Sequence, residues 1–302
     1  MAIRPGALLR AVRPQQWIKN GLVFLPFVFS EGQEVAWSLD HLGPVPGLIV
    51  RLLVVFAAFC ALSGAIYLVN DLTDRKADRQ HPVKRHRPIA SGKVGVPTAV
   101  AVIMALAAAG LAGMFLVDLV LGGIGVLYLA ISVSYSLGIK RVVLADVLVV
   151  ASGYVIRTAA GAVAIEVTPS PWLYATTAAG ALFIVLGRRY AEVRLAGDGA
   201  ADQRSVLSKY AGPFISQLLA MSATAAWLSY TLYTVEADNL PQNNTMMLTI
   251  PLVTLGLFRY LYLLNTSEEA EAPEQLIIHD FPLVLSIVAW VATAGLVLIL
   301  ND

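Results

Sequence analysis

Long apolar runs constrain what this chain can fold into more than any other feature of its sequence. A membrane-spanning helix needs roughly 17 to 25 mostly apolar residues, and the chain contains nine runs near that length. They lie at about residues 18–30, 48–70, 97–117, 119–139, 143–165, 171–187, 214–235, 245–263 and 282–300. We therefore predict an all-α integral membrane protein, a bundle of nine transmembrane helices that crosses a lipid bilayer.

The composition agrees with this fold class and excludes others. Of the 302 residues, 58% are apolar and 14% are charged, whereas soluble domains are roughly half apolar and a quarter charged. Intrinsic disorder is thereby excluded, and so is a disulfide scaffold, because the only cysteine is Cys60. No charged or Ser/Pro-rich linker divides the chain, so we expect a single transmembrane domain over residues 1–302. No motif points to nucleic acid as a partner.

The charged residues are unevenly distributed, although their formal sum is only +1. If the N-terminus is cytoplasmic, 18 of the 21 Lys and Arg residues fall on the cytoplasmic side. The segments on that side are 1–20, 71–96, 140–141, 188–212 and 264–281, the last of which is acidic. The positive-inside rule therefore predicts a multi-pass protein with charged cap loops on the cytoplasmic face. We expect it to lie in the plasma (inner) membrane. An active site built from these loops would then also lie on the cytoplasmic face.

The sequence N-D-L-T-D-R-K-A-D at residues 70–78 closes the second predicted span. At helical spacing, Asp71, Asp74 and Asp78 share one face over two turns. Neighbouring carboxylates repel one another, and Mg²⁺ suits oxygen-only ligands of this kind. We expect Asn70 and the three aspartates to hold Mg²⁺ and the aspartates to be catalytic. The alternative is a solvated helix end whose aspartates pair with three basic neighbours, Arg75, Lys76 and Arg79.

A basic stretch, H-P-V-K-R-H-R-P, follows at residues 81–88 and contributes Lys84, Arg85 and Arg87. Acidic and basic residues in one loop predict a magnesium–diphosphate site, in which carboxylates hold the metal and Lys or Arg neutralises the remaining phosphate charge. The loop could instead anchor the protein to anionic lipid headgroups, but that interpretation does not account for the aspartates.

The second long charged loop opens with R-R-Y-A-E at residues 188–192. Glu192 is a candidate for a second catalytic metal position that faces the first. Three residues before it are candidates for substrate binding: Arg188, Arg189 and Tyr190. A plain amphipathic surface helix is the competing interpretation.

Two charges lie inside one predicted span, eleven residues apart, namely Asp146 and Arg157. Ionisable groups within a membrane usually face a cavity or a partner, so both are candidate substrate-binding residues. Arg157 is the deeper residue and the better candidate for an internal phosphate contact. Asp146 could instead lie at the interface and pair with Lys140 and Arg141.

Three further residues are candidates for substrate binding. Tyr128 and Tyr135 are seven residues apart and share one face of the fourth predicted span, where they could line a cavity or a helix contact. Lys19 begins the first span within R-P-Q-Q-W-I-K-N, where it could bind phosphate or extend its ammonium group to the interface.

Nine spans, the aspartate motif after the second and an acidic segment after the sixth resemble the UbiA superfamily of membrane prenyltransferases, and the resemblance covers nearly the whole chain. Five separated motifs are similar, in order, to those of its decaprenyl-phosphate phosphoribosyltransferase branch. They are R-P-Q-Q-W-I-K-N at 13–20, Y-L-V-N-D at 67–71, H-P-V-K-R-H-R-P-I-A at 81–90, G-Y-V-I-R at 153–157 and R-Y-A-E at 189–192.

The resemblance implies an Mg²⁺-dependent enzyme whose donor is 5-phosphoribosyl-1-diphosphate and whose acceptor is polyprenyl (decaprenyl) phosphate. The product would supply arabinan precursors for a cell wall, and relatives are expected to form homo-oligomers. Other UbiA prenyltransferases carry two spaced aspartates in the second motif, where this chain has Tyr190 and Glu192. Whether Asp198 or Asp202 joins that motif stays open.

Two other functions also fit these residues. A true prenyltransferase, which moves a prenyl group from its diphosphate to an aromatic or lipid acceptor, needs the same aspartates. A carrier that only binds phosphorylated lipid would leave the aspartates as the end of a helix. The identity of the donor distinguishes the first alternative, and replacement of Asp74 by Asn distinguishes the second.

Overall fold

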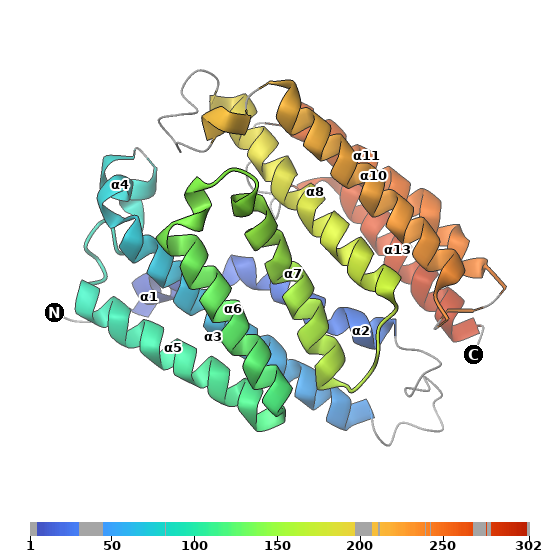
Figure 1. Cartoon of the computed structure of the whole chain (residues 1–302), viewed down its shortest axis with the longest axis horizontal. Coiled ribbons are helices and arrows are strands. Elements are labelled where there is room, and N and C mark those ends of the chain that lie inside the picture. The colour runs from blue at the N-terminus through green and yellow to red at the C-terminus, as the bar shows by residue number, and fades with distance from the viewer. Residues whose placement is uncertain are drawn as a thin grey trace.

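The computed structural model describes residues 5–29, 45–81, 83–196, 207–210, 212–238, 240–241, 243–267, 276 and 279–300. Every element of regular structure in these ranges is a helix, as predicted, and the helices pack side by side into a bundle (Figure 1).

Eight helices are long. They are α3 (Val45–Thr73), α5 (Val96–Val117), α6 (Leu119–Leu137), α7 (Ala145–Ala164), α8 (Pro171–Ala196), α10 (Pro213–Glu236), α11 (Ile250–Thr266) and α13 (Phe281–Leu300). The short elements are α1 (Pro5–Val12), η1 (Pro14–Phe24), α2 (Leu25–Val28), α4 (Arg75–Gln80), η2 (Lys84–His86), η3 (Ile139–Arg141), η5 (Leu207–Tyr210) and η6 (Thr245–Thr249).

Within the described part of the chain, six helical segments are both long and apolar enough to cross a membrane: α3, α5, α6, α7, the continuous segment Thr245–Thr266, and α13. The protein is therefore a multi-pass membrane protein, although the count of nine spans stays a prediction. Helices α8 and α10 have 26 and 24 residues, which at 1.5 Å per residue is long enough for a hydrocarbon core of about 30 Å.

The first predicted span is not a continuous α-helix. Residues 14–24 form the 3₁₀-helix η1, and α2 adds only four residues after it. Proline occupies the start of both elements, at Pro14 and Pro26, and a proline inside an α-helix removes one hydrogen bond and clashes with the preceding turn. The sequence pattern therefore identified the apolar segment and missed its break.

Helix η1 packs against α3 and α7 and buries Asn20 and Val23. Its close approach to α7 depends on Gly161, because a Cβ atom there would lie 2.0 Å from the carbonyl oxygen of Val23. Buried side chains from η1, α3, α6 and α7 form one apolar core, and side chains from α8, α10 and α11 form most of another.

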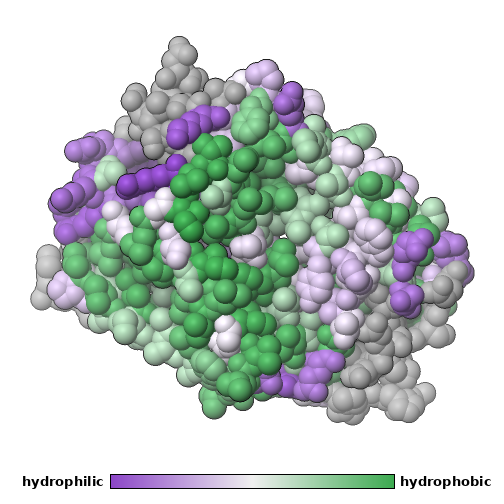
Figure 2. All heavy atoms as spheres, viewed as in Figure 1, coloured by the Kyte–Doolittle hydropathy of each residue, from purple (hydrophilic) through white to green (hydrophobic). Residues whose placement is uncertain are grey.

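The surface separates into an apolar zone and polar ends. Figure 2 shows a broad hydrophobic area over the middle of the bundle, with hydrophilic residues gathered at the end where α4 lies and again toward the opposite end. A hydrophobic zone between two polar ends is the surface expected of a bundle immersed in lipid.

Candidate active site

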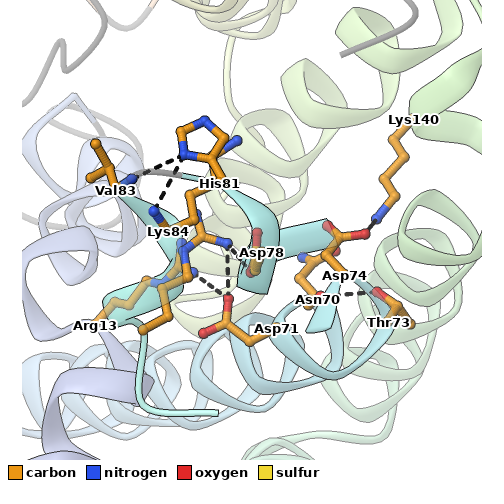
Figure 3. A network of polar contacts seen from close by, with 11 residues as sticks. Arg13, Asn70, Asp71, Thr73, Asp74, Asp78, His81, Val83, Lys84 and Lys140 are labelled. Atoms are coloured by element: carbon orange, nitrogen blue, oxygen red, sulfur yellow. Dashed lines mark hydrogen bonds and ion pairs between the residues drawn. The ribbon is translucent and has the colours of Figure 1, made fainter. Parts of the chain in front are cut away.

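The first acidic segment, residues 70–78 with Asp71, Asp74 and Asp78, is not one continuous helix. Helix α3 ends at Thr73, Asp74 lies in the turn, and α4 begins at Arg75. As a result the three aspartates do not share one face as predicted. Asp71 and Asp78 face a common cation, whereas Figure 3 shows Asp74 directed at Lys140, on the side away from Arg13.

Asp71 is a buried carboxylate, 1% exposed, with two arginine partners on one oxygen. Its Oδ1 atom accepts from Arg13 Nη2 at 2.5 Å and from Arg87 Nη1 at 3.3 Å. The same Arg87 Nη1 donates to Asp78 Oδ2 at 2.8 Å. The other oxygen of Asp71, Oδ2, is buried and has no hydrogen-bond partner among the described residues. A bare buried carboxylate oxygen is costly, so this atom is suited to a cation.

Arg13 is a site residue that the sequence interpretation missed. It adopts a left-handed backbone conformation (φ 56°) directly before η1, and its guanidinium lies 5.1 Å from the ring centroid of Tyr67. A non-glycine residue in this region indicates a local constraint. Its position in the R-P-Q-Q-W-I-K-N motif was the only available signal.

The pairing expected for a solvated helix end is wrong. Asp74 Oδ1 accepts from Lys140 Nζ at 2.5 Å, and Lys140 itself is buried. Arg79 instead donates through Nε to the carbonyl oxygen of Ala90 at 3.0 Å. All three aspartates therefore have cationic partners outside α4: Arg13 directly before η1, Arg87 directly after η2, and Lys140 in η3.

The basic loop lies over this acidic segment. Arg87 is half-buried between the aspartates, while Arg85 is exposed and lies beside His86. His81 Nδ1 accepts from the backbone N–H groups of Val83 and Lys84 at 3.2 and 3.4 Å (Figure 3). Partial burial, with the charge of Lys84, lowers the pKa of His81, which agrees with a neutral ring that accepts hydrogen bonds.

The second acidic segment, which contains Arg188, Arg189 and Glu192, is built at the C-terminal end of α8. Arg189 is buried; its Nε donates to Asp146 Oδ2 at 3.0 Å, and its Nη1 pairs with Glu192. Arg188 is more exposed and pairs with Glu192 at 3.1 Å. The expectation that Asp146 pairs with Lys140 and Arg141 is wrong, because Asp146 is 0% exposed and faces α8.

A second partner of Asp146 comes from the 188–212 loop. Tyr210 donates its hydroxyl to Asp146 Oδ1 at 2.5 Å and accepts from the Leu144 N–H at 2.8 Å. Burial, together with the Asp146 hydrogen bond, raises the pKa of Tyr210. Tyr190 points elsewhere and donates to Asn265 Oδ1 at 2.5 Å on α11. Two other candidates for the second motif, Asp198 and Asp202, lie outside the described residues.

The segment from η3 to the first turn of α7 contacts both acidic segments. Lys140 in η3 pairs with Asp74, and Asp146 in the first turn of α7 pairs with Arg189. These four residues come from α6–α7, α3–α4 and α8, so the fold brings the two charged loops to the same end of the bundle. Tyr135 on α6 lies near enough to Arg189 to interact with it electrostatically.

Arg157 lies deeper, at the centre of a buried network. Its Nε donates to Asn20 Oδ1 at 2.7 Å, its Nη1 to the Gly153 carbonyl at 2.5 Å, and its Nη2 to the Tyr128 hydroxyl at 3.0 Å. The guanidinium also lies 5.0 Å from the Tyr128 ring centroid. The network ties η1, α6 and α7 together, which is a structural role; contact with a phosphate stays a prediction.

An apolar cavity of about 590 Å³ lies between η1, α7, α8, α10, α11 and α13. Lys19 lines it and donates to Gln16 Oε1 at 2.7 Å. Ile18 of η1 and Ile287 of α13 also line it and are 58% and 38% exposed, so the cavity reaches the bundle surface between these helices. None of the three aspartates lines this cavity.

Element η1 connects the aspartates with the cavity. Arg13, which pairs with Asp71, directly precedes η1, and Lys19 lies six residues later in the cavity wall. At about 2.0 Å per residue, a 3₁₀-helix separates these two positions by about 12 Å along its axis.

The residues present fit a divalent cation held by few protein ligands. No group of three His, Cys, Asp or Glu side chains in the described part of the chain could hold a metal by itself. However, Mg²⁺ usually takes one or two carboxylates and completes its shell with water and substrate phosphate oxygens. Asp71, with its unpartnered Oδ2, and Asp78 form such a pair.

Residues 34–279 match the UbiA prenyltransferase family, and the chain belongs to that family. It is similar to the decaprenyl-phosphate phosphoribosyltransferase of Mycobacterium tuberculosis, with 35% identity over 288 residues, 95% of this chain and 93% of the relative. The enzyme of that name from Corynebacterium glutamicum is 32% identical, over 94% of this chain and 84% of the relative.

Solved structures agree on the fold. A UbiA homologue from Archaeoglobus fulgidus, determined with DMAPP and Mg²⁺, has a TM-score of 0.69 at 18% identity and covers 96% of this chain and 98% of its own. A homologue from Aeropyrum pernix K1 has a TM-score of 0.59 at the same identity and covers 95% of this chain and 99% of its own. At this identity the likeness defines the architecture and not the substrate.

Proposed function

We propose that this protein transfers 5-phosphoribose from 5-phosphoribosyl-1-diphosphate to a polyprenyl (decaprenyl) phosphate and releases diphosphate. The connection made by η1 carries this proposal, because it joins a charged, phosphate-suited site at Asp71 to an apolar cavity suited to a lipid chain. Relatives that carry this activity in their names match nearly the whole chain, which supports the same conclusion. The chain acts as one domain over residues 1–302.

The donor binds at the acidic segments. Asp71 and Asp78, assisted by Asn70 and Asp74, would hold Mg²⁺, which when bound polarises the diphosphate and stabilises its departing charge. Arg13 and Arg87 lie on the aspartates and supply further positive charge for phosphate oxygens. Lys84, Arg85 and Arg188 are partly or largely exposed and able to reach a soluble substrate.

The acceptor needs no general base, because the oxygen of a lipid phosphate is already anionic. Its isoprenoid chain would lie in the apolar cavity, and Lys19 would approach its phosphate from the cavity wall. Glu192 is held by Arg188 and Arg189 opposite the first segment, where it would orient the donor. Tyr128, Tyr135, Asp146, Arg157 and Tyr190 act by holding these elements in place.

The charge distribution supports a plasma (inner) membrane location with the site on the cytoplasmic face, since a soluble phosphorylated sugar arrives from that side. The product would serve as a precursor of cell-wall arabinan, as the family resemblance of the sequence motifs implies. A homo-oligomer is expected by family resemblance.

The deciding experiment supplies labelled phosphoribosyl diphosphate and polyprenyl phosphate to membranes that contain the protein. We expect label in the lipid extract that requires Mg²⁺. Consumption of a prenyl diphosphate with no labelled lipid would favour the prenyltransferase alternative instead.

Asp74→Asn separates an enzyme from a lipid carrier. Asp74 is the most exposed of the three aspartates, with 36% of its side chain accessible, and its loss should abolish turnover while the protein still folds and inserts. Asp118→Asn, at the N-cap of α6 outside the site, is the matched control and should keep full turnover. Retained activity in Asp74→Asn would show that Asp74 takes no part in holding the metal.

A further inference from the structure

The apolar cavity is closed at the end far from the charged loops. Leu173 near the start of α8 and Tyr233 near the end of α10 line this end, whereas the ion pairs of Arg189 and Glu192 lie at the opposite end of α8. The cavity therefore runs along the bundle from Lys19 toward the non-charged ends of the helices.

Four aromatic side chains close that end, and we call them the aromatic wall: Phe29, Tyr230, Tyr233 and Trp290. Phe29 packs edge-on against Tyr233 at 5.7 Å and lies 6.0 Å from Trp290, measured between ring centroids. Trp290 Nε1 donates to the Tyr230 hydroxyl at 2.6 Å, and that hydroxyl contacts Thr249 Oγ1 at 2.6 Å. The wall is thus fixed by both packing and hydrogen bonds.

Among the described residues, a buried apolar cluster packs behind the wall. Phe29, Tyr230 and Tyr233 are 5%, 5% and 1% exposed and belong to a cluster that continues into Met246 and Val297. A chain that reaches the wall cannot continue in the same direction, because interiors packed in this way contain few voids. The remaining way out is sideways, where Ile18 and Ile287 are exposed.

We propose that the aromatic wall determines how much of the acceptor's isoprenoid chain the protein holds, and hence which chain lengths it accepts efficiently. This inference rests on the proposed function. Isoprene units that lie between Lys19 and the wall are buried and contribute to binding of the acceptor. Isoprene units beyond that length leave the cavity laterally and contribute less to binding.

Two substitutions change the cavity in opposite directions. Gly180→Leu places a side chain in the cavity, since a Cβ at Gly180 meets no atom within 4 Å. Trp290→Ala removes part of the wall while Tyr230 keeps its contact with Thr249. Gly123→Leu is the matched control, because Gly123 is exposed on α6, outside the cavity, and also has no atom within 4 Å of a Cβ.

The experiment measures kcat/KM for a series of polyprenyl phosphates, from farnesyl to decaprenyl phosphate, at saturating phosphoribosyl diphosphate. Gly180→Leu should lower the value for long acceptors relative to farnesyl phosphate by on the order of tenfold, equivalent to about two methylene groups no longer buried. Trp290→Ala should move the preference toward longer acceptors, and Gly123→Leu should reproduce the wild-type profile.

Each outcome decides between the possibilities. If Gly180→Leu gives the same length profile as the wild type and Gly123→Leu, the acceptor chain does not lie in this cavity. If Trp290→Ala folds but keeps the wild-type length profile, the wall assignment is wrong. In both cases the proposed function stands. If the wild type transfers no phosphoribose to any acceptor, the proposed function itself fails, and the inference with it. If Trp290→Ala does not fold, Trp290→Leu, which keeps an apolar side chain at this position, provides the same test of the wall.

Discussion

A single methyl group at Gly161 should disturb both stability and catalysis. In Gly161→Ala the new Cβ would lie 2.0 Å from the Val23 carbonyl oxygen and 2.8 Å from its carbonyl carbon, whereas ordinary contact begins near 3.4 Å. Because both obstructing atoms belong to the backbone, no side-chain rotation relieves the clash, and η1 must move away from α7 by about 1.4 Å. Overpacking of this kind costs about 1–3 kcal/mol of unfolding free energy.

The same movement reaches the site. Asn20 lies three residues before Val23 and accepts a hydrogen bond from Arg157 at 2.7 Å, and Arg13, directly before η1, pairs with Asp71. Misplacement of a positioning group by 1 Å can cost on the order of 10²-fold in rate. We therefore expect kcat/KM for phosphoribosyl transfer to fall by about that factor although Gly161 contacts no substrate.

The assay combines unfolding of the purified protein in mixed detergent micelles with turnover of labelled donor. The control is Gly123→Ala, also in a long helix but with no atom within 4 Å of the new Cβ; its unfolding free energy should stay level or rise by about 0.5–1 kcal/mol through improved helix propensity. Unchanged stability and turnover in Gly161→Ala would refute the argument from close approach.

Three further predictions follow from the ion pairs. Arg189→Met leaves the fully buried Asp146 without its cation and should lower the unfolding free energy by about 3–5 kcal/mol in the same micelle assay; the double variant with Asp146→Asn should recover part of this loss. Mg²⁺ with diphosphate should stabilise the wild type and raise its unfolding temperature. At a hundredfold excess over Kd, binding adds about 2.7 kcal/mol to the unfolding free energy. An equal rise in unfolding temperature in Asp71→Asn would contradict the assignment of Asp71 as a ligand. The hydrogen bond from Arg259 lowers the pKa of Asp280. This pair therefore adds stability above the ordinary carboxyl pKa and loses it as the pH falls through the lowered value, and in acid titrations Asp280→Asn should remove that part of the pH dependence.

The sequence identified most of the charged site but not its internal pairing. The motif at 70–78 pointed to Asp71 and Asp78, and the structure brings both onto Arg87. Helical spacing also predicted that Asp74 shares their face, which was wrong because the helix is interrupted at that residue. The partner of Asp74 is Lys140, which comes from the connection between α6 and α7, and local spacing contains no information about that contact.

Long sequence separations explain the residues that were missed. Arg13 and Asp71 are 58 positions apart, and Lys140 and Asp74 are 66 apart. Tyr210 reaches Asp146 over 64 positions. Each of these residues has an ordinary local role in the sequence, as part of a basic or turn segment, and only packing of the helices gives it a partner.

What the sequence determined by itself follows from local physics. Burial in lipid requires helices of a certain length, so apolar runs define most of the spans, and the uneven distribution of Lys and Arg predicts which ends of the helices face the cytoplasm. The tertiary structure alone decided which charges neutralise which, how η1 joins the aspartates to the apolar cavity, and where that cavity ends. These features depend on contacts between distant segments. One such contact is the close approach of η1 to α7 at Gly161, which is possible because glycine carries a hydrogen atom in place of a Cβ.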